Sequence, residues 1–105
     1  MIIRIVKMTF IPEQVEAFKA LFEDVKHKII NMPGCQHLEL WKDINSDHVL
    51  YTYSIWNSEA DLNHYRDSEL FINTWKNTKI KFSEKAQAWS VEKLYESSHN
   101  ISSNK

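Results

Sequence analysis

The sequence has very few of the residues from which common nucleotide and metal sites are built. Its 105 residues include one glycine, Gly34, and one cysteine, Cys35. A dinucleotide-binding fingerprint or a phosphate loop needs several glycines, so both are excluded. A single cysteine excludes an internal disulfide and favours a reducing, cytoplasmic location. No cluster of Cys and His has zinc-like spacing. We therefore expect neither a metal nor another cofactor.

Clustered positive charge and long apolar runs are missing as well. The formal net charge is -1, and the basic residues are spread along the chain, whereas a nucleic-acid surface needs a basic patch. No apolar run approaches the ~20 residues that span a membrane. We expect neither nucleic acid nor a membrane as partner. Aromatic residues are plentiful instead, with four Trp, four Tyr and five Phe. Such side chains line cavities and subunit interfaces as readily as cores.

Apolar periodicity divides the chain into strands and helices. Pro12 suits the first turn of a helix, and Pro33-Gly34 ends that helix. Ser58 and Ser68 are placed to cap two later helices. The predicted strands cover residues 2–10, 35–42, 48–56 and 86–95, and the predicted helices cover residues 12–32, 58–65 and 68–82.

This order is β-α-β-β-α-β with the second helical region broken in two. It predicts an α+β, ferredoxin-like fold, in which helices cover one face of an antiparallel four-stranded sheet. We assign residues 1–95 to this domain and residues 96–105 to a flexible polar tail. The uncovered face carries His37, Glu39 and Trp41 or their neighbours, which is more aromatic surface than a small domain should expose. We therefore predict a homodimer in which sheet meets sheet.

Two short motifs support a family resemblance. Pro12-Glu13 opens the first helix, and Trp56-x-Ser58-Glu59 leads to Leu62, His64 and Phe71. With the single ferredoxin-like unit, these motifs resemble the antibiotic biosynthesis monooxygenase family of dimeric α/β barrels. The resemblance covers roughly residues 1–95, nearly the whole predicted domain.

The resemblance implies a pocket between sheet and helices in each subunit. Members of this family include cofactor-free monooxygenases of quinols and polycyclic phenols, haem-degrading enzymes, signal-molecule enzymes and proteins of no known activity. The haem-degrading branch uses an Asn on the first strand, where this chain has Arg4 and Lys7, which argues against haem degradation. His64 falls where many members have a histidine at the start of the second helical region.

A cofactor-free oxygenation needs a base, a group that steadies an oxyanion and a dry box for a flat, electron-rich substrate. His64 is our candidate base, and Arg66 or Tyr65 would steady the anion. The predicted aromatic box consists of Trp56, Phe71, Trp75 and Trp89.

Other readings of these residues stay open at this point. His64 is also consistent with a solvated or capping residue. A structural hydrogen bond and an ion pair to Asp61 or Asp67 fit Tyr65 and Arg66 better than a catalytic role does. The first functional hypothesis is a monooxygenase acting on a quinol-like or phenolic molecule. The second is a non-catalytic, ligand-binding or stress-related dimer with the same barrel, and the third is a haem-binding relative.

Overall fold

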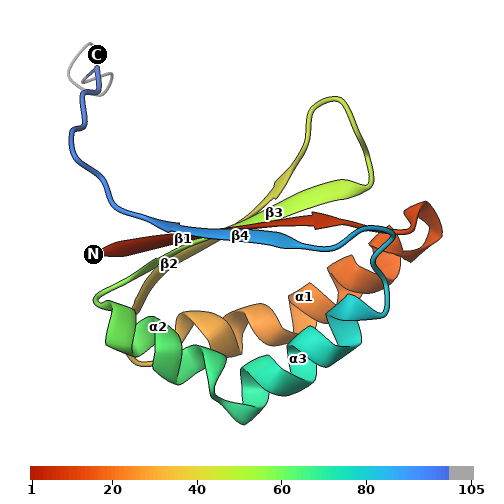
Figure 1. Cartoon of the computed structure of the whole chain (residues 1–105), viewed down its shortest axis with the longest axis horizontal. Helices are drawn as coiled ribbons and strands as arrows, with labels where there is room; N and C mark the ends of the chain where they lie inside the picture. The colour runs from red at the N-terminus through yellow and green to blue at the C-terminus, as the bar shows by residue number, and fades with distance from the viewer. Residues whose placement is uncertain (100–105) are drawn as a thin grey trace.

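A computed structural model describes residues 1–99 and shows a sheet covered on one face by helices (Figure 1). The predicted α+β, ferredoxin-like fold is confirmed. No helix in the described part of the chain is both long and apolar enough to cross a membrane. The elements in chain order are β1 (Ile2–Thr9), the 3-10 turn η1 (Pro12–Gln14), α1 (Val15–Ile30), β2 (Cys35–Lys42), β3 (Val49–Trp56), α2 (Glu59–Arg66), α3 (Glu69–Lys79) and β4 (Gln87–Val91).

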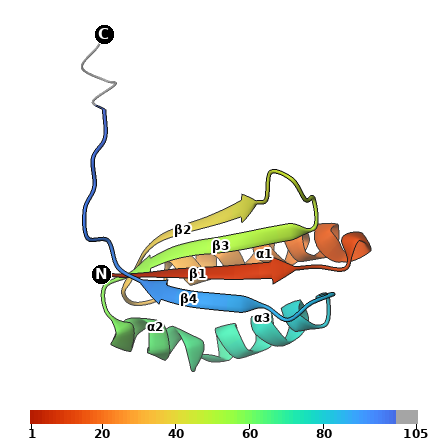
Figure 2. The ribbon, with the colours of Figure 1, turned by 45° about the horizontal axis from the view of Figure 1, so that its top comes forward.

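The four strands form one antiparallel sheet in the order β2-β3-β1-β4 (Figure 2). β1 is central and pairs with β3 along its whole length, from Ile2 opposite Trp56 to Thr9 opposite Val49. Because side chains alternate between the two faces of a strand, each directly opposed pair shares a face. The register between the strands therefore determines which residues face the helices.

The last strand is shorter than the pattern predicts. We expected residues 86–95, but β4 is Gln87–Val91. β4 pairs only with β1, and the last pair is Ile3 with Val91. Since β1 begins at Ile2, almost no partner strand remains for the residues after Val91. The segment that follows leaves the sheet on the side away from the helices (Figure 1). Of the predicted tail, residues 100–105 lie outside the described residues.

Two serines cap the later helices as predicted. The Ser58 hydroxyl accepts the backbone N–H of Asp61 at 3.1 Å, and the Ser68 hydroxyl accepts that of Phe71 at 3.1 Å. The prediction that the last helix continues to Phe82 is wrong, because α3 ends at Lys79. The chain leaves the helix there to pair with the end of β1, where Phe10 and Phe82 form a bridge.

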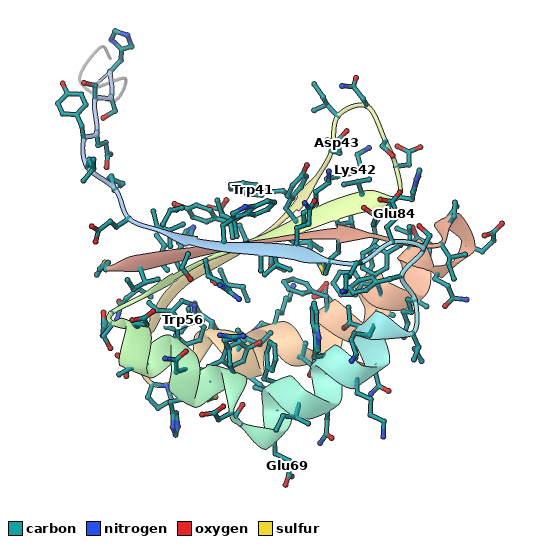
Figure 3. All side chains as sticks on the ribbon, viewed as in Figure 1. Trp41, Lys42, Asp43, Trp56, Glu69 and Glu84 are labelled. Atoms are coloured by element: carbon teal, nitrogen blue, oxygen red, sulfur yellow. The ribbon has the colours of Figure 1, made fainter. Side chains whose placement is uncertain are left out.

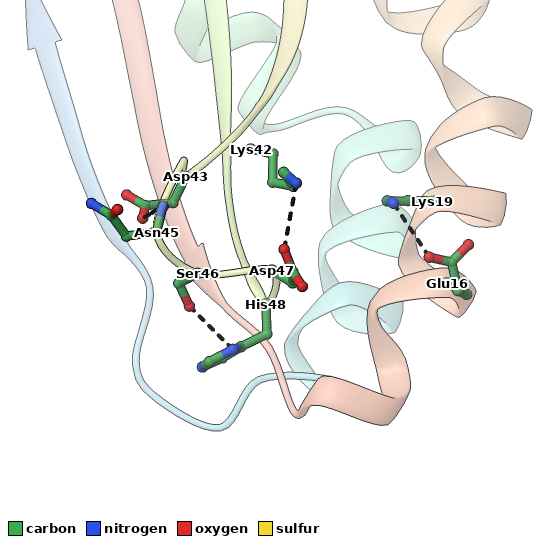
Figure 4. A network of polar contacts seen from close by, with 8 residues as sticks. All are labelled: Glu16, Lys19, Lys42, Asp43, Asn45, Ser46, Asp47 and His48. Carbon is green, nitrogen blue, oxygen red and sulfur yellow. Dashed lines mark hydrogen bonds and ion pairs between the residues drawn. The ribbon is translucent and has the colours of Figure 1, made fainter.

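The turn between β2 and β3 is held by polar side chains (Figure 4). The Asp43 carboxylate accepts the backbone N–H of Asn45 at 3.0 Å, a local bond that favours a turn over a strand. Lys42 and Asp47 form an exposed ion pair at 3.4 Å across the same turn. This loop lies at the end of the sheet opposite α2, and none of its residues lines the candidate site.

The buried core is divided into two clusters. One joins β1, α1 and β3 through Met8, Phe10, Val15, Phe18 and Leu50. The other joins the start of β2, the end of β3 and α2 through Cys35, Trp56 and Leu62. The helices therefore meet the sheet firmly at two places, and the space between those places is not filled by a third cluster.

Candidate functional site

A cavity of about 290 Å³ lies between the two core clusters. The sheet forms one side, and α1, α2 and α3 form the other. Ligand pockets for small molecules begin near this size, at about 300 Å³. Its lining residues that matter below are Arg4, Val6 and Met8 of β1, Thr52, Ser54 and Trp56 of β3, Tyr65 and Arg66 of α2, and Phe71, Thr74 and Trp75 of α3.

Small side chains on the sheet account for the free volume. Thr52 and Ser54 on β3 and Ala88 on β4 face the cavity from the sheet. These side chains reach only a short way towards the helices, whereas cores normally pack without voids. The helices keep their distance because Phe18 and Trp56 are buried at either end, 4% and 0% exposed respectively. The cavity thus follows from the size pattern of the sequence.

Aromatic rings in mutual contact form a wall of the cavity. Tyr65 stacks on Trp56 with ring centres 4.9 Å apart, and meets Phe71 edge-on at 5.2 Å. Phe71 in turn stacks on Trp75, with centres 5.8 Å apart and planes 11° from parallel. The Trp56 indole is fixed by its N–H, which donates to Ser54 Oγ at 3.0 Å. Figure 3 shows Trp56 between the sheet and the helices. A flat apolar ligand would meet matching ring faces here.

Two arginines bring positive charge to the cavity. Arg4 projects from the central strand, and its Nη1 donates to Ser90 Oγ at 2.9 Å. Burial lowers the pKa of Arg4, and the neighbouring charge of Arg66 lowers it further. Arg66 lines the cavity while remaining exposed, which places it at the opening. The lining residues include no aspartate or glutamate in the part of the chain that the structure describes.

Tyr65 is a neutral hydrogen-bond donor at this site. Burial raises the pKa of its phenol above the usual value, and the nearby Cys35 adds to the shift. Burial also raises the pKa of the Cys35 thiol, partly offset by its contact with the carbonyl of His37. Both groups therefore keep their protons at neutral pH. Tyr65 can donate a hydrogen bond to an oxygen, but it is not equipped to remove a proton.

Five of the predicted site residues come together in the cavity. They are Arg66, Tyr65, Trp56, Phe71 and Trp75. Among residues 1–99, no group of three or more His, Cys, Asp or Glu side chains is placed to hold a metal ion.

The structure corrects the placement of the other two. His64 is exposed on α2 and does not line the cavity. Successive helical residues point about 100° apart, so a helix that turns Tyr65 inward leaves its neighbour in solvent. Trp89 lies on the opposite face of the sheet, paired with Ile5 and 44% exposed. Strand alternation gives the cavity Ala88 instead.

Sequence reasoning missed Arg4, Thr52 and Thr74 as lining residues. Arg4 did carry a signal, because it shares the alternation of Val6 and Met8 and therefore the face that the helices cover. A charge at such a position is unusual and marks a polar cavity better than a histidine on a helix surface does.

Comparisons with known proteins agree with this fold. The sequence profile described as antibiotic biosynthesis monooxygenase matches residues 1–76. A search of curated proteins found no match. Among solved structures, a conserved protein from Methanosarcina mazei Go1 has a TM-score of 0.83 at 19% identity, covering 89% of this chain and 93% of that one.

Two further structures are as similar. Rv0793 from Mycobacterium tuberculosis has a TM-score of 0.83 at 18% identity, covering 92% of this chain and 98% of its own. A structure titled antibiotic biosynthesis monooxygenase has a TM-score of 0.84 at 16% identity, covering 90% of this chain and 100% of its own. At these identities the likeness shows the fold.

Proposed function

The chain belongs to the antibiotic biosynthesis monooxygenase family, and from this premise we propose that it is a cytoplasmic, cofactor-independent monooxygenase of a quinol-like or phenolic molecule. The observation that carries the proposal is the ring-walled cavity of about 290 Å³ beside Arg4, Tyr65 and Arg66. Its rings suit a flat substrate, and its donors suit an oxygen that gains negative charge.

In this proposal the substrate itself supplies the electrons. A phenol with a free para position loses its hydroxyl proton, and the resulting anion reacts with O2 at the para carbon. One oxygen atom stays on that carbon, the other leaves as water, and the phenol becomes a quinone. The phenol gives up four electrons and two hydrogens, which balances the reduction of O2. Arg66 and Tyr65 steady the anion, and the closed apolar walls keep bulk water from the reacting carbon.

We also propose that the protein works as a homodimer, with a second copy of this chain covering the open sheet face. Trp41, Trp89 and Val91 on this face are 39%, 44% and 45% exposed. The Trp41 ring stacks on Tyr53 at 4.8 Å, so these side chains already form an ordered surface (Figure 3). An apolar face of a sheet is covered at least cost by an identical face across a two-fold axis.

Oxygen uptake tests the catalytic proposal. A panel of hydroquinones and phenols is supplied to the wild type, to Trp75→Ala and to His64→Ala. We expect uptake by the wild type with at least one compound, a loss of about tenfold or more in Trp75→Ala because the ring wall is broken, and little change in His64→Ala because His64 lies outside the cavity. Loss of uptake in His64→Ala alone would instead support the sequence-based assignment of His64 as the base.

One observation favours a second candidate, a ligand-binding protein without catalytic activity. The ionisable groups that line the cavity, as far as the structure describes the chain, are Arg4, Arg66 and Tyr65, and none of these residue types normally loses a proton near neutral pH. Saturable binding of flat aromatics without oxygen uptake from any of them would establish this second function.

A further inference from the structure

Arginine is used in this chain at the cavity and nowhere else. The sequence has 13 Lys and Arg residues, of which only Arg4 and Arg66 are arginine. Both line the cavity, and none of the lysines within residues 1–99 does. The two arginines come from different elements, the central strand β1 and the last turn of α2. Arginine differs from lysine in offering a planar fork of donors that matches a carboxylate with two hydrogen bonds.

Neither arginine has a carboxylate partner among the residues that the structure describes. Among residues 1–99 the structure records five ion pairs, and none of them includes Arg4 or Arg66. The side-chain contact recorded for Arg4 is the neutral hydroxyl of Ser90. Arg66 gains some stabilisation from the carbonyl end of α2, but Arg4 lies in the middle of a strand and has no such field. A half-buried cation without a counter-charge is costly to keep.

The two charges also act on each other unfavourably. Burial is the larger cause of the lowered pKa of Arg4, and repulsion from Arg66 lowers that pKa further. An anion placed between the two guanidinium groups would remove this repulsion and supply the missing counter-charge. The two cations that line the cavity therefore make it complementary to a negative group.

The register of the sheet shows which end of the cavity holds the charge. Arg4 is opposite Ser54, one step from the Trp56 end, which α2 covers with Tyr65. In the other direction along β1 the lining residues are Val6 and Met8, which pack in the apolar cluster around Phe18. The cavity thus has a cationic end, and toward Val6 and Met8 its lining carries no charged side chain among the described residues.

We propose that the cavity binds a planar aromatic carboxylate, with the carboxylate between Arg4 and Arg66 and the rings along Phe71 and Trp75. This inference rests on the proposed function for the identification of the cavity as the substrate site, and it adds the charge of the substrate. The two cations would also favour the ionised form of a hydroxyl next to the carboxylate, which assists the loss of its proton without a protein base.

Calorimetric titration with two matched probes tests the charge. 1-Hydroxy-2-naphthoate and 1-naphthol share the same rings and hydroxyl and differ by one carboxylate. The wild type should bind the naphthoate about ten- to a hundredfold more tightly at neutral pH, as expected for charge-assisted hydrogen bonds. Arg4→Met and Arg66→Met should each remove most of this difference, because each weakens binding of the naphthoate far more than binding of 1-naphthol.

A control variant and a folding check accompany these measurements. Lys28→Met removes a positive charge from an exposed position of α1, and it should keep the wild-type preference for the naphthoate. Arg66 is exposed, so Arg66→Met is expected to fold even if Arg4→Met does not, and circular dichroism with thermal unfolding checks both.

The outcomes separate this inference from the proposed function. Equal affinity for both probes, or a preference that survives in Arg66→Met, would overturn the inference, and oxygen uptake with neutral quinols would then still support a monooxygenase. An arginine-dependent preference for the naphthoate without oxygen uptake from any phenol or hydroxynaphthoate would support the inference and refute the monooxygenase. Binding of neither probe would overturn the inference, and oxygen uptake with the panel of hydroquinones and phenols would still decide the monooxygenase.

Discussion

In the middle of the sheet, the two faces depart from the polarity that a one-sided sheet usually shows. Such a sheet turns apolar residues to its helices and polar residues to water. Here, in the middle of the sheet, the side towards the helices carries Arg4, Thr52 and Ser54. The outer side carries Ile5 between Tyr53 and Trp89. The inner polar residues surround a cavity. The outer apolar residues lie on the face that we propose a second copy covers.

Aromatic residues also have different surroundings on the two faces of the sheet. The inner rings around Trp56 and Trp75 stand over small side chains and leave a hollow. The outer rings of Trp41 and Tyr53 stack on each other, and Trp41 is partly exposed on this face. Rings that border empty volume suit a small ligand, whereas a flat, exposed set of rings suits a protein surface. The four predictions that follow test this division, beginning with the largest expected effect.

The outer face is tested by placing a charge at its centre. Ile5→Glu puts a carboxylate between Tyr53 and Trp89, where a covering second copy would bury it without a partner. We expect the dimer to dissociate completely at micromolar concentration, measured by light scattering after size exclusion. Ile72→Glu is the matched control, because Ile72 is 54% exposed on α3, and it should leave the dimer intact. A wild type that is already monomeric would contradict the proposed cover.

The inner face is tested by filling the cavity. Ala88→Leu adds apolar volume at a lining position of β4. We expect aromatic ligands to bind about tenfold or more weakly, because the added side chain takes their space, and thermal stability to stay equal or rise as the void is filled. Gln87→Leu makes a similar change on the opposite face and should leave ligand affinity unchanged in calorimetric titrations. Equal losses in both variants would show that the effect is not local to the cavity.

The approach of α2 to the inner face depends on Gly34. Its φ is +83°, and a Cβ added there would lie 2.4 Å from the Asp61 side chain at the start of α2. We expect Gly34→Ala to lower the free energy of unfolding by about 1–3 kcal/mol, the cost of a strained left-handed residue with a close contact. Chemical denaturation measures the change. The exposed neighbour Gln36→Ala should cost much less, and an equal cost would argue against the close approach.

The smallest effect concerns Tyr65 at alkaline pH. Because its pKa is raised in the folded protein, the folded state holds a proton that the unfolded chain loses above about pH 10. The free energy of unfolding should therefore fall as pH rises above that value, by up to about 1.4 kcal/mol per pH unit from this group. Tyr65→Phe should lose this part of the decline in denaturation curves. The exposed Tyr95→Phe should follow the wild type, and a Tyr65→Phe curve that does likewise would contradict burial of the phenol.

Most of the fold could be predicted from the sequence because local signals agreed with tertiary structure. The alternation of apolar and polar residues predicted β2, and the capping serines predicted where α2 and α3 begin. The ends of α3 and β4 could not be predicted, because each is set by pairing with β1. A pairing between segments that are distant in sequence cannot be detected from the residue pattern within a window of ten residues.

Site residues could be predicted where their spacing along one helix was enough. They could not be predicted where the rotation of a helix or the register of a strand had to be known. Phe71 and Trp75 are four residues apart on one helix, so they share a face whatever the helix packs against. His64 and Tyr65 are neighbours, so the rotation of α2 decides between them: Tyr65 lies three residues after the buried Leu62 and packs on Trp56. Trp89 belongs to a five-residue edge strand, whose inward face is fixed by its register with β1.

A crystal structure of the protein with bound 1-hydroxy-2-naphthoate tests the central claim most directly, because it examines both faces of the sheet at once. The account predicts ring density inside the cavity along Trp75, a carboxylate within hydrogen-bond distance of Arg4 and Arg66, and a second copy covering Trp89 and Tyr53. An empty cavity with the naphthoate lying on the outer face, or a sheet face left open to solvent, would contradict it.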